Sequence, residues 1–445
     1  MQPMPVSAPV GRGGRAPRRG RGESGLTLLE LIVALSIFAI LAGGITLLVD
    51  SGLSLARNNR NRSIAAHLAS QEMDAVRRSD FTTLPIGMTT STVSVDGVGY
   101  TVNRNAEWVD NTSTSAACDS ASSVPQVLRI SVNVSWPDMR GIPPARSATM
   151  LSPPVGSYDP NSGHVAVQVR DRDAAPLGGV PVRVQGGTVD TTITTTDEFG
   201  ARPGCAFFAF LPAGTYTVTL GLTGYVDRQG MASPSQTAGV SVGQVSSVAF
   251  DYDAAATLQL AITGEAGGSP VTDLPLNLAN TALLPTGVRS DSGTGLARTI
   301  GDLFPFADGY QVWAGSCADA DPEGQDSGGT AYWPGAVRAT AFSTTPGGTT
   351  AGDVVLPTIE ISFSELGLPG GSDDVIAVHA SDAGCSAGET WTVATFTDPS
   401  GVALASLPYG TWELQVPGHS PSGSWPTVVV SPLNASPTSV SVVVQ

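Results

Sequence analysis

An uninterrupted apolar run near the amino terminus constrains this chain more than any other feature. Leu31 to Val49 is 19 residues without a charge. A helix of that length spans about 28 Å, close to the thickness of the hydrocarbon core of a bilayer. Five basic residues precede the run: Arg12, Arg15, Arg18, Arg19 and Arg21. Because basic flanks stay on the cytoplasmic side, we expect a single-pass segment in the cytoplasmic membrane with its amino terminus inside.

A carboxylate stands at the start of this run. Glu30 precedes Leu31 directly, and a carboxylate at membrane depth costs about 2–3 kcal/mol unless it is paired. A signal peptide or plain signal anchor is the alternative reading, but such a signal has no use for Glu30. Apolar residues also continue at helical spacing beyond the run. We therefore predict one helix over residues 26–79, roughly 80 Å long.

The segment Gly25-Leu26-Thr27-Leu28-Leu29-Glu30 resembles the amino terminus of type IV prepilins and of type II secretion pseudopilins, most closely their minor subunits. The resemblance covers residues 1–55. It implies that a prepilin peptidase cleaves after Gly25 and that the new first residue, Leu26, is N-methylated. It also implies that Glu30 pairs with the terminal amine of a neighbouring subunit during assembly. The leader is longer than is usual for type IV pilins, and Leu47 stands where many major pilins have a proline.

The same resemblance implies partners and a location. The partners are other pilin or pseudopilin subunits, the prepilin peptidase, the pilus assembly machinery and the cytoplasmic membrane. The processed chain then enters a filament in the periplasm or at the cell surface. An uncleaved, membrane-tethered surface adhesin is the alternative. We expect no nucleic-acid partner, because the chain carries a formal charge of −16 although residues 1–25 are basic.

The remaining chain is typical of β structure, with 52 Gly, 33 Pro and only 13% charged residues. The alternating residues 92–95 and 100–102 flank Asp96-Gly97, which predicts a hairpin. Residues 127–136 alternate cleanly, which predicts a strand with one buried and one solvated face. A long helix packed on a small antiparallel sheet is the pilin head that the resemblance implies. We predict this α+β pilin fold for residues 26–152, after a leader at residues 1–25.

A short motif then recurs. Residues 211–216 (LPAGTY) match residues 407–412 (LPYGTW), and residues 304–310 (FPFADGY) are a looser copy. The copies begin 93 and 103 residues apart, a period that suits a tandem sandwich domain. The amino-acid sequence around the first copy resembles that of carboxypeptidase regulatory-like, or transthyretin-like, β-sandwich domains. Such domains serve as stalks or binding modules. We therefore predict three tandem all-β sandwich domains, at residues 160–253, 256–356 and 358–445.

The four cysteines form no C-x-x-C motif, so a zinc or thioredoxin site has no sequence motif behind it. Outside the membrane such cysteines oxidise. Of the three possible connectivities we favour Cys118–Cys205, which would join the head to the first sandwich, and Cys317–Cys385, which would bridge the last two. Buried free thiols are the alternative.

An acidic segment resembles the start of a calcium loop. Asp319, Asp321 and Glu323 occupy positions 1, 3 and 5, and a glycine follows at position 6. Position 12 would be Thr330 instead of the usual glutamate. Calcium is therefore one interpretation and a solvated acidic loop is the other; we expect no other cofactor.

Nothing in the sequence indicates an enzyme. The chain has no lysine, which excludes a Schiff base, a P-loop lysine and a Lys–Asn crosslink. The four histidines are scattered and none lies in a metalloprotease motif. We expect a structural subunit whose exposed β-rich head serves adhesion or cargo contact. Trp313, Trp333 and Trp425 are candidates for the contact surface, and core packing is the competing reading for them.

Overall fold

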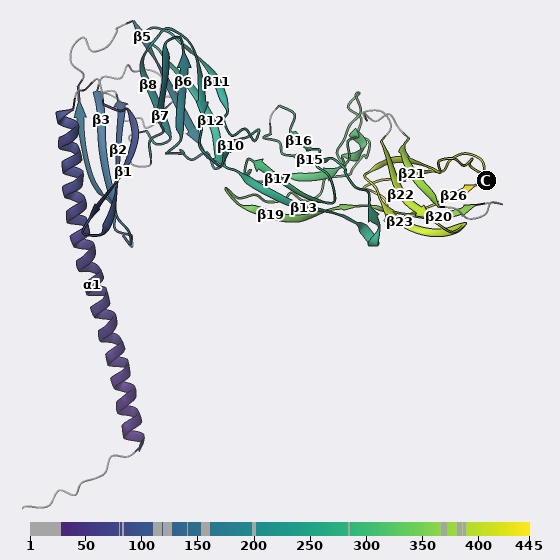
Figure 1. Ribbon diagram of the computed structural model, residues 1–445, viewed down its shortest axis with the longest axis horizontal. Helices are drawn as coiled ribbons and strands as arrows, with labels where there is room; N and C mark the ends of the chain where they lie inside the picture. Colours follow the sequence, from purple (N-terminus) through teal and green to yellow (C-terminus); the bar gives the residue numbers. More distant parts are fainter. Residues whose placement is uncertain are drawn as a thin grey trace, which may run out of the picture. The chain divides into compact units, whose positions relative to one another are not determined.

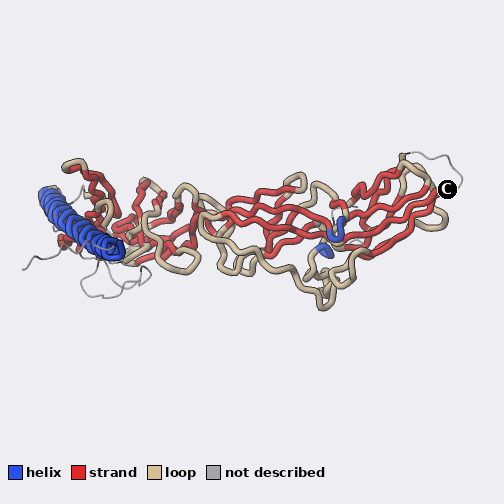
Figure 2. The backbone as a smooth tube through the Cα atoms, turned by 90° about the horizontal axis from the view of Figure 1, so that it is seen from below, coloured by secondary structure: helices blue, strands red, loops and turns tan. Residues whose placement is uncertain are grey.

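The structure is a computed structural model that describes residues 28–79, 81, 84–109, 118, 127–139, 141–152, 161–197, 202–283, 285–365, 372–380, 385 and 389–445. The chain divides into two compact units between Ile64 and Ala65. In the described part of the chain, the long helix is followed by strands, with the short 3-10 helices η2 (Glu265–Gly267) and η3 (Ala318–Ala320) among them (Figure 2).

Helix α1 (Leu28–Arg78) is continuous over 51 residues (Figure 1), or about 76 Å. The predicted long helix is therefore confirmed from Leu28 onward. In the second unit the helix buries Ala65, Ala69, Met73 and Val76. Their spacing of three and four residues places them on one face.

The head is a four-stranded antiparallel sheet in the order β1-β2-β3-β4. Its strands are β1 (Gly87–Val95), β2 (Val98–Val109), β3 (Val127–Ser135) and β4 (Ala145–Leu151). The predicted hairpin is confirmed, because β1 and β2 pair directly around Asp96 and Gly97. Both turn residues have positive φ, 52° and 79°, as a tight two-residue hairpin turn requires. An ion pair of 3.2 Å between Arg104 and Glu72 joins β2 to α1.

Strand β3 differs from the prediction on one face. Its apolar positions Leu128 and Ile130 are fully buried, as expected. Its polar positions Ser131 and Asn133 are buried as well, with 6% and 5% of their surface exposed. The predicted solvated face is therefore wrong. β3 is an interior strand with a partner on either side, and alternation fixes only where a side chain points, not what covers that face.

Residues 162–254 form two packed four-stranded sheets, in the orders β10-β12-β5-β8 and β11-β9-β6-β7. Between them lies one buried apolar cluster. The strands are β5 (Ser162–Arg170), β6 (Pro181–Gly186), β7 (Val189–Thr194), β8 (Cys205–Pro212), β9 (Gly214–Leu220), β10 (Tyr225–Asp227), β11 (Ser235–Val240) and β12 (Val245–Ala254).

Residues 256–356 form a second pair of sheets, β17-β13-β19 and β16-β15-β18. The elements are β13 (Ala256–Gly264), η2 (Glu265–Gly267), β14 (Ser269–Pro270), β15 (Leu276–Ala279), β16 (Val288–Asp291), β17 (Ala297–Leu303), β18 (Gln311–Ala314), η3 (Ala318–Ala320) and β19 (Thr349–Leu356).

The last pair of sheets has the orders β14-β23-β20-β26 and β22-β21-β24-β25. Its own strands are β20 (Thr358–Glu365), β21 (Asp373–His379), β22 (Thr390–Phe396), β23 (Ser400–Ser406), β24 (Gly410–Gln415), β25 (Thr427–Val430) and β26 (Thr438–Val444). β14 comes from the preceding segment, and one buried apolar cluster runs from Ala256 to Val444. The last two sandwiches thus share a core. The boundaries of the sandwich domains at residues 160–253, 256–356 and 358–445 stay predictions.

The three sandwiches repeat one topology. The first strand of each pairs in parallel with the last: β5 with β12, β13 with β19, and β20 with β26. In the facing sheets β6, β15 and β21 each lie between two antiparallel neighbours. The sequence period is therefore the period of a folding unit, and the chain is an α+β head followed by β-sandwich domains.

The recurring motif places one aromatic residue in each sandwich core. Tyr216, Tyr310 and Trp412 are all at least 96% buried. Each donates a hydrogen bond back to a carbonyl at the start of its own motif: Tyr216 Oη to Pro212 (2.7 Å), Tyr310 Oη to Phe304 (2.8 Å) and Trp412 Nε1 to Pro408 (3.1 Å). An aromatic side chain with a polar tip can fill the core and also donate a hydrogen bond to a backbone carbonyl. The motif makes this same pair of interactions in all three sandwiches.

Candidate functional site

The first candidate site is the amino-terminal part of α1. The helical segment Leu31–Arg78 is long and apolar enough to cross a membrane, with a mean hydropathy of 2.6 over its most apolar window and none of that window buried. Leu28, Phe38 and Leu48 each expose more than two thirds of their surface. Exposed apolar surface on this scale requires a nonpolar environment.

The residues predicted to be processed or paired are Gly25, Leu26 and Glu30. Glu30 is the third described residue of α1. Gly25 and Leu26 lie outside the described residues. Cleavage after Gly25, methylation of Leu26 and the charge pair at Glu30 therefore stay predictions.

Two disulfides are present, and they are the pairs expected from the sequence. Cys118 bonds to Cys205 on β8, with 5.6 Å between their Cα atoms. Cys317 precedes η3 and bonds to Cys385, with a Cα separation of 4.5 Å. The first links the segment after β2 to the first sandwich, and the second links the last two sandwiches.

The predicted calcium ligands are not brought together. Asp319 faces His379, with its two oxygens 3.1 and 3.2 Å from Nε2. Asp321 instead accepts two hydrogen bonds from the guanidinium of Arg338, at 2.6 and 2.8 Å, and Glu323 lies 3.6 Å from the same guanidinium. Bonding to Asp321 raises the pKa of Arg338. Within the described part of the chain the three acids form no common metal-ligand group.

The three tryptophans predicted as contact residues differ in burial. Trp313 is 8% exposed and lies beneath the guanidinium of Arg338, 4.6 Å from the ring centroid. Trp333 Nε1 donates to the carbonyl of Asp319 at 2.6 Å, and Trp425 packs against the shared core. Core packing is therefore the correct reading for Trp313, whereas Trp333 and Trp425 are partly exposed and their part in a contact surface stays a prediction.

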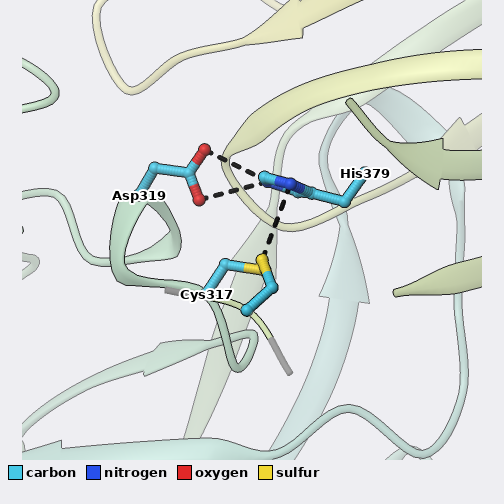
Figure 3. Close-up of side chains that lie close together, drawn as sticks. Cys317, Asp319 and His379 are labelled. Atoms are coloured by element: carbon cyan, nitrogen blue, oxygen red, sulfur yellow. Dashed lines mark hydrogen bonds and ion pairs between the residues drawn. A yellow bond between two sulfur atoms is a disulfide. The ribbon is translucent and has the colours of Figure 1, made fainter. Parts of the chain in front are cut away.

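A second candidate site, which sequence reasoning missed, surrounds the Cys317–Cys385 disulfide. His379 ends β21, and its Nδ1 lies 3.5 Å from Cys385 Sγ. Asp319, Cys317 and His379 point toward one another (Figure 3). The ligand atoms of these four residues all lie within 4.8 Å of one another. His379 and Asp319 are buried, and Trp412 packs edge-on against the imidazole at 5.0 Å.

The residues of this site are visible in the sequence, but they lie in two segments far apart along the chain. Cys317 and Asp319 are two residues apart, and His379 and Cys385 are six apart, but 60 residues separate Asp319 from His379. No local motif joins the halves, because the shared core of two sandwiches brings them together. The structure therefore places a disulfide beside a carboxylate–imidazole pair, and its sulfurs become soft metal donors only when the disulfide is reduced.

In a comparison with known protein families, one family model matches this chain. Residues 20–46 match the model of the prokaryotic N-terminal methylation motif. No curated protein matches the chain.

Several solved structures are distantly similar. The Bacillus anthracis TIE protein is 11% identical, over 85% of this chain and 78% of that chain, with a TM-score of 0.20. The minor pilin GBS52 of Streptococcus agalactiae is 13% identical, over 44% and 95%, with a TM-score of 0.20. BcpA, the major pilin subunit of Bacillus cereus, is 9% identical, over 64% and 99%, with a TM-score of 0.19. Likenesses of this size assign no function. The methylation motif is the feature that this chain shares with a described family.

Proposed function

We propose that this chain is the precursor of a minor type IV pilin or pseudopilin, a structural subunit of a cell-surface or secretion filament and not an enzyme. One observation carries the proposal: the methylation motif at residues 20–46 overlaps the start of α1, where the helix exposes its apolar side chains. A bilayer covers that surface before assembly, and the packed helices of other subunits cover it afterwards.

The proposal gives Glu30 a specific role. Cleavage after Gly25 would create a positive amine on Leu26, at the edge of the membrane. A carboxylate on a neighbouring copy can neutralise that amine, and the pair costs less in an apolar filament core than two separate charges. The prepilin peptidase and the assembly machinery are therefore partners in this proposal, and the basic leader stays in the cytoplasm until it is removed.

The β-rich part would be the exposed head. Three successive sandwiches cannot be buried inside a helical shaft, so we place this subunit at the filament tip or as a decoration, where it serves adhesion or cargo contact. Trp313 does not belong to that contact surface because it is buried, whereas Trp333 and Trp425 are partly exposed and stay candidates for it.

Immunogold labelling of sheared filaments tests this placement. An antibody against residues 256–445 should decorate filament ends or sparse positions, and the chain should appear in the sheared fraction. Even labelling along the shaft would contradict the tip placement. Absence from sheared filaments, with the chain retained in membranes, would instead favour the tethered adhesin.

A further inference from the structure

The surroundings of the Cys317–Cys385 disulfide contain more polar donors than a structural crosslink needs. A disulfide sulfur has no proton to donate, yet each sulfur here has a polar atom next to it. Glu389 Oε2 lies 3.3 Å from Cys317 Sγ, and His379 Nδ1 lies 3.5 Å from Cys385 Sγ. The contact with Glu389 joins two acceptors in the oxidised chain, so it is not a hydrogen bond.

These distances suit metal coordination. Zinc in proteins takes four donors in a tetrahedron, about 2.3 Å from sulfur and about 2.0–2.2 Å from nitrogen or oxygen, which puts neighbouring donors roughly 3.3–3.8 Å apart. The two sulfur contacts, at 3.3 and 3.5 Å, are within that range.

The residue that contacts His379 from behind, Asp319, is also of the kind found in metal sites. A metal-bound histidine usually donates a hydrogen bond from its other ring N–H to a carboxylate. This bond fixes the orientation of the ring and its tautomer. Asp319 takes this position, with both oxygens close to His379 Nε2, and it is 4% exposed. Cys385 and Glu389 are partly exposed, which leaves a route for an ion.

We propose that Cys317, Cys385 and His379 bind zinc when the disulfide is reduced, with Asp319 positioning the imidazole and the fourth position open to a water molecule beside Glu389. A dithiol reductant opens the bond: it supplies two electrons and two protons, leaves two cysteine thiols, and itself becomes a disulfide. Zinc then replaces the two thiol protons, which go to solvent. Thiolate and imidazole ligands favour zinc over calcium.

The site has a structural consequence. Cys317 belongs to the second sandwich, and the other two ligands, His379 and Cys385, belong to the third. Zinc would therefore restore, under reducing conditions, the crosslink that the disulfide makes under oxidising ones. The inference is independent of the proposed filament role, because it concerns only this junction.

Site-resolved alkylation tests the proposal in the unaltered chain. The full-length protein in detergent is reduced with a phosphine, which adds no competing thiol, and is then treated with iodoacetamide with or without zinc chloride. Zinc should slow alkylation of Cys317 and Cys385 by about tenfold or more. Cys118 and Cys205 belong to no metal-ligand group among the residues that the structure describes, so they are the internal control and should react equally in both samples. Equal reaction at all four cysteines, or equal protection of both pairs, would overturn the proposal.

Cobalt and two variants test the individual ligands. Cobalt added to the reduced chain should give the strong absorption of a tetrahedral site with thiolate-to-cobalt bands, and the oxidised chain should give none. His379→Gln should abolish these bands and the protection by zinc. Asp319→Asn should keep the bands but weaken zinc affinity 10–100-fold, as second-layer changes do.

His419→Gln is the matched control for those variants. His419 also pairs with a carboxylate, Asp373 Oδ1 at 3.1 Å, but it has no cysteine in its group. It should leave both the bands and the protection unchanged. Bands of equal intensity in His379→Gln and in the unaltered chain would exclude this histidine and refute the site.

Discussion

Replacing Glu30 by alanine is expected to remove this chain from filaments while leaving it in the membrane. The apolar run that follows Glu30 is unchanged, so insertion proceeds. Without the carboxylate, the amine at Leu26 of the adjoining copy stays unpaired in an apolar core. Breaking a buried charge pair costs about 3–5 kcal/mol, and each 1.4 kcal/mol is a factor of about ten. Incorporation should therefore fall by roughly a hundredfold or more, measured by immunoblotting of sheared filaments against membranes.

Two further variants separate charge from position. Asp50→Ala removes a carboxylate from the same helix, at the other end of the apolar run and exposed, and should assemble normally. Glu30→Gln keeps the size and removes the charge, so it should fail like alanine. If Glu30→Ala enters filaments as readily as the unaltered chain, the proposed charge pair does not exist.

Trp412→Ala is expected to be the most destabilising single change in the sandwiches. The indole is fully buried, belongs to the core shared by the last two sandwiches, and donates to the carbonyl of Pro408. Truncating a buried tryptophan costs about 3–5 kcal/mol through lost burial and the cavity left behind. Urea denaturation followed by circular dichroism should show the loss.

Conservative variants separate the parts of that loss. Trp412→Phe keeps most of the ring and removes the hydrogen bond, so it should cost about 1–3 kcal/mol. Val402→Ala, at a side chain that is 66% exposed on β23, should change stability by less than about 0.5 kcal/mol. Equal losses for Trp412→Ala and Val402→Ala would show that the motif aromatic is not a core residue.

Local patterns predicted much of this fold. The apolar run with its helical continuation gave α1 from Leu28 to Arg78, and Asp96-Gly97 gave the first hairpin. The recurring motif predicted the repeat of the sandwiches, because each copy contributes one buried aromatic residue to its sandwich. These features depend on neighbours in the sequence, so they can be read from it.

Features that depend on distant contacts were missed. The polar face of β3 is buried although its alternation is that of a half-solvated strand. Asp319 and Asp321 have the spacing of calcium ligands, but His379 and Arg338 bind them from elsewhere in the chain. Trp313 lies under Arg338, where no local pattern would place it. In each of these cases the local pattern does not identify the neighbour that decides the side chain's environment.

The mass of the mature amino terminus tests the central claim most directly. The protein is isolated from cells that assemble filaments, and its amino-terminal peptide is identified by mass spectrometry. The account predicts a chain that begins at Leu26 and carries one N-methyl group. A chain that retains residues 1–25 would contradict it and leave a membrane-tethered adhesin in its place.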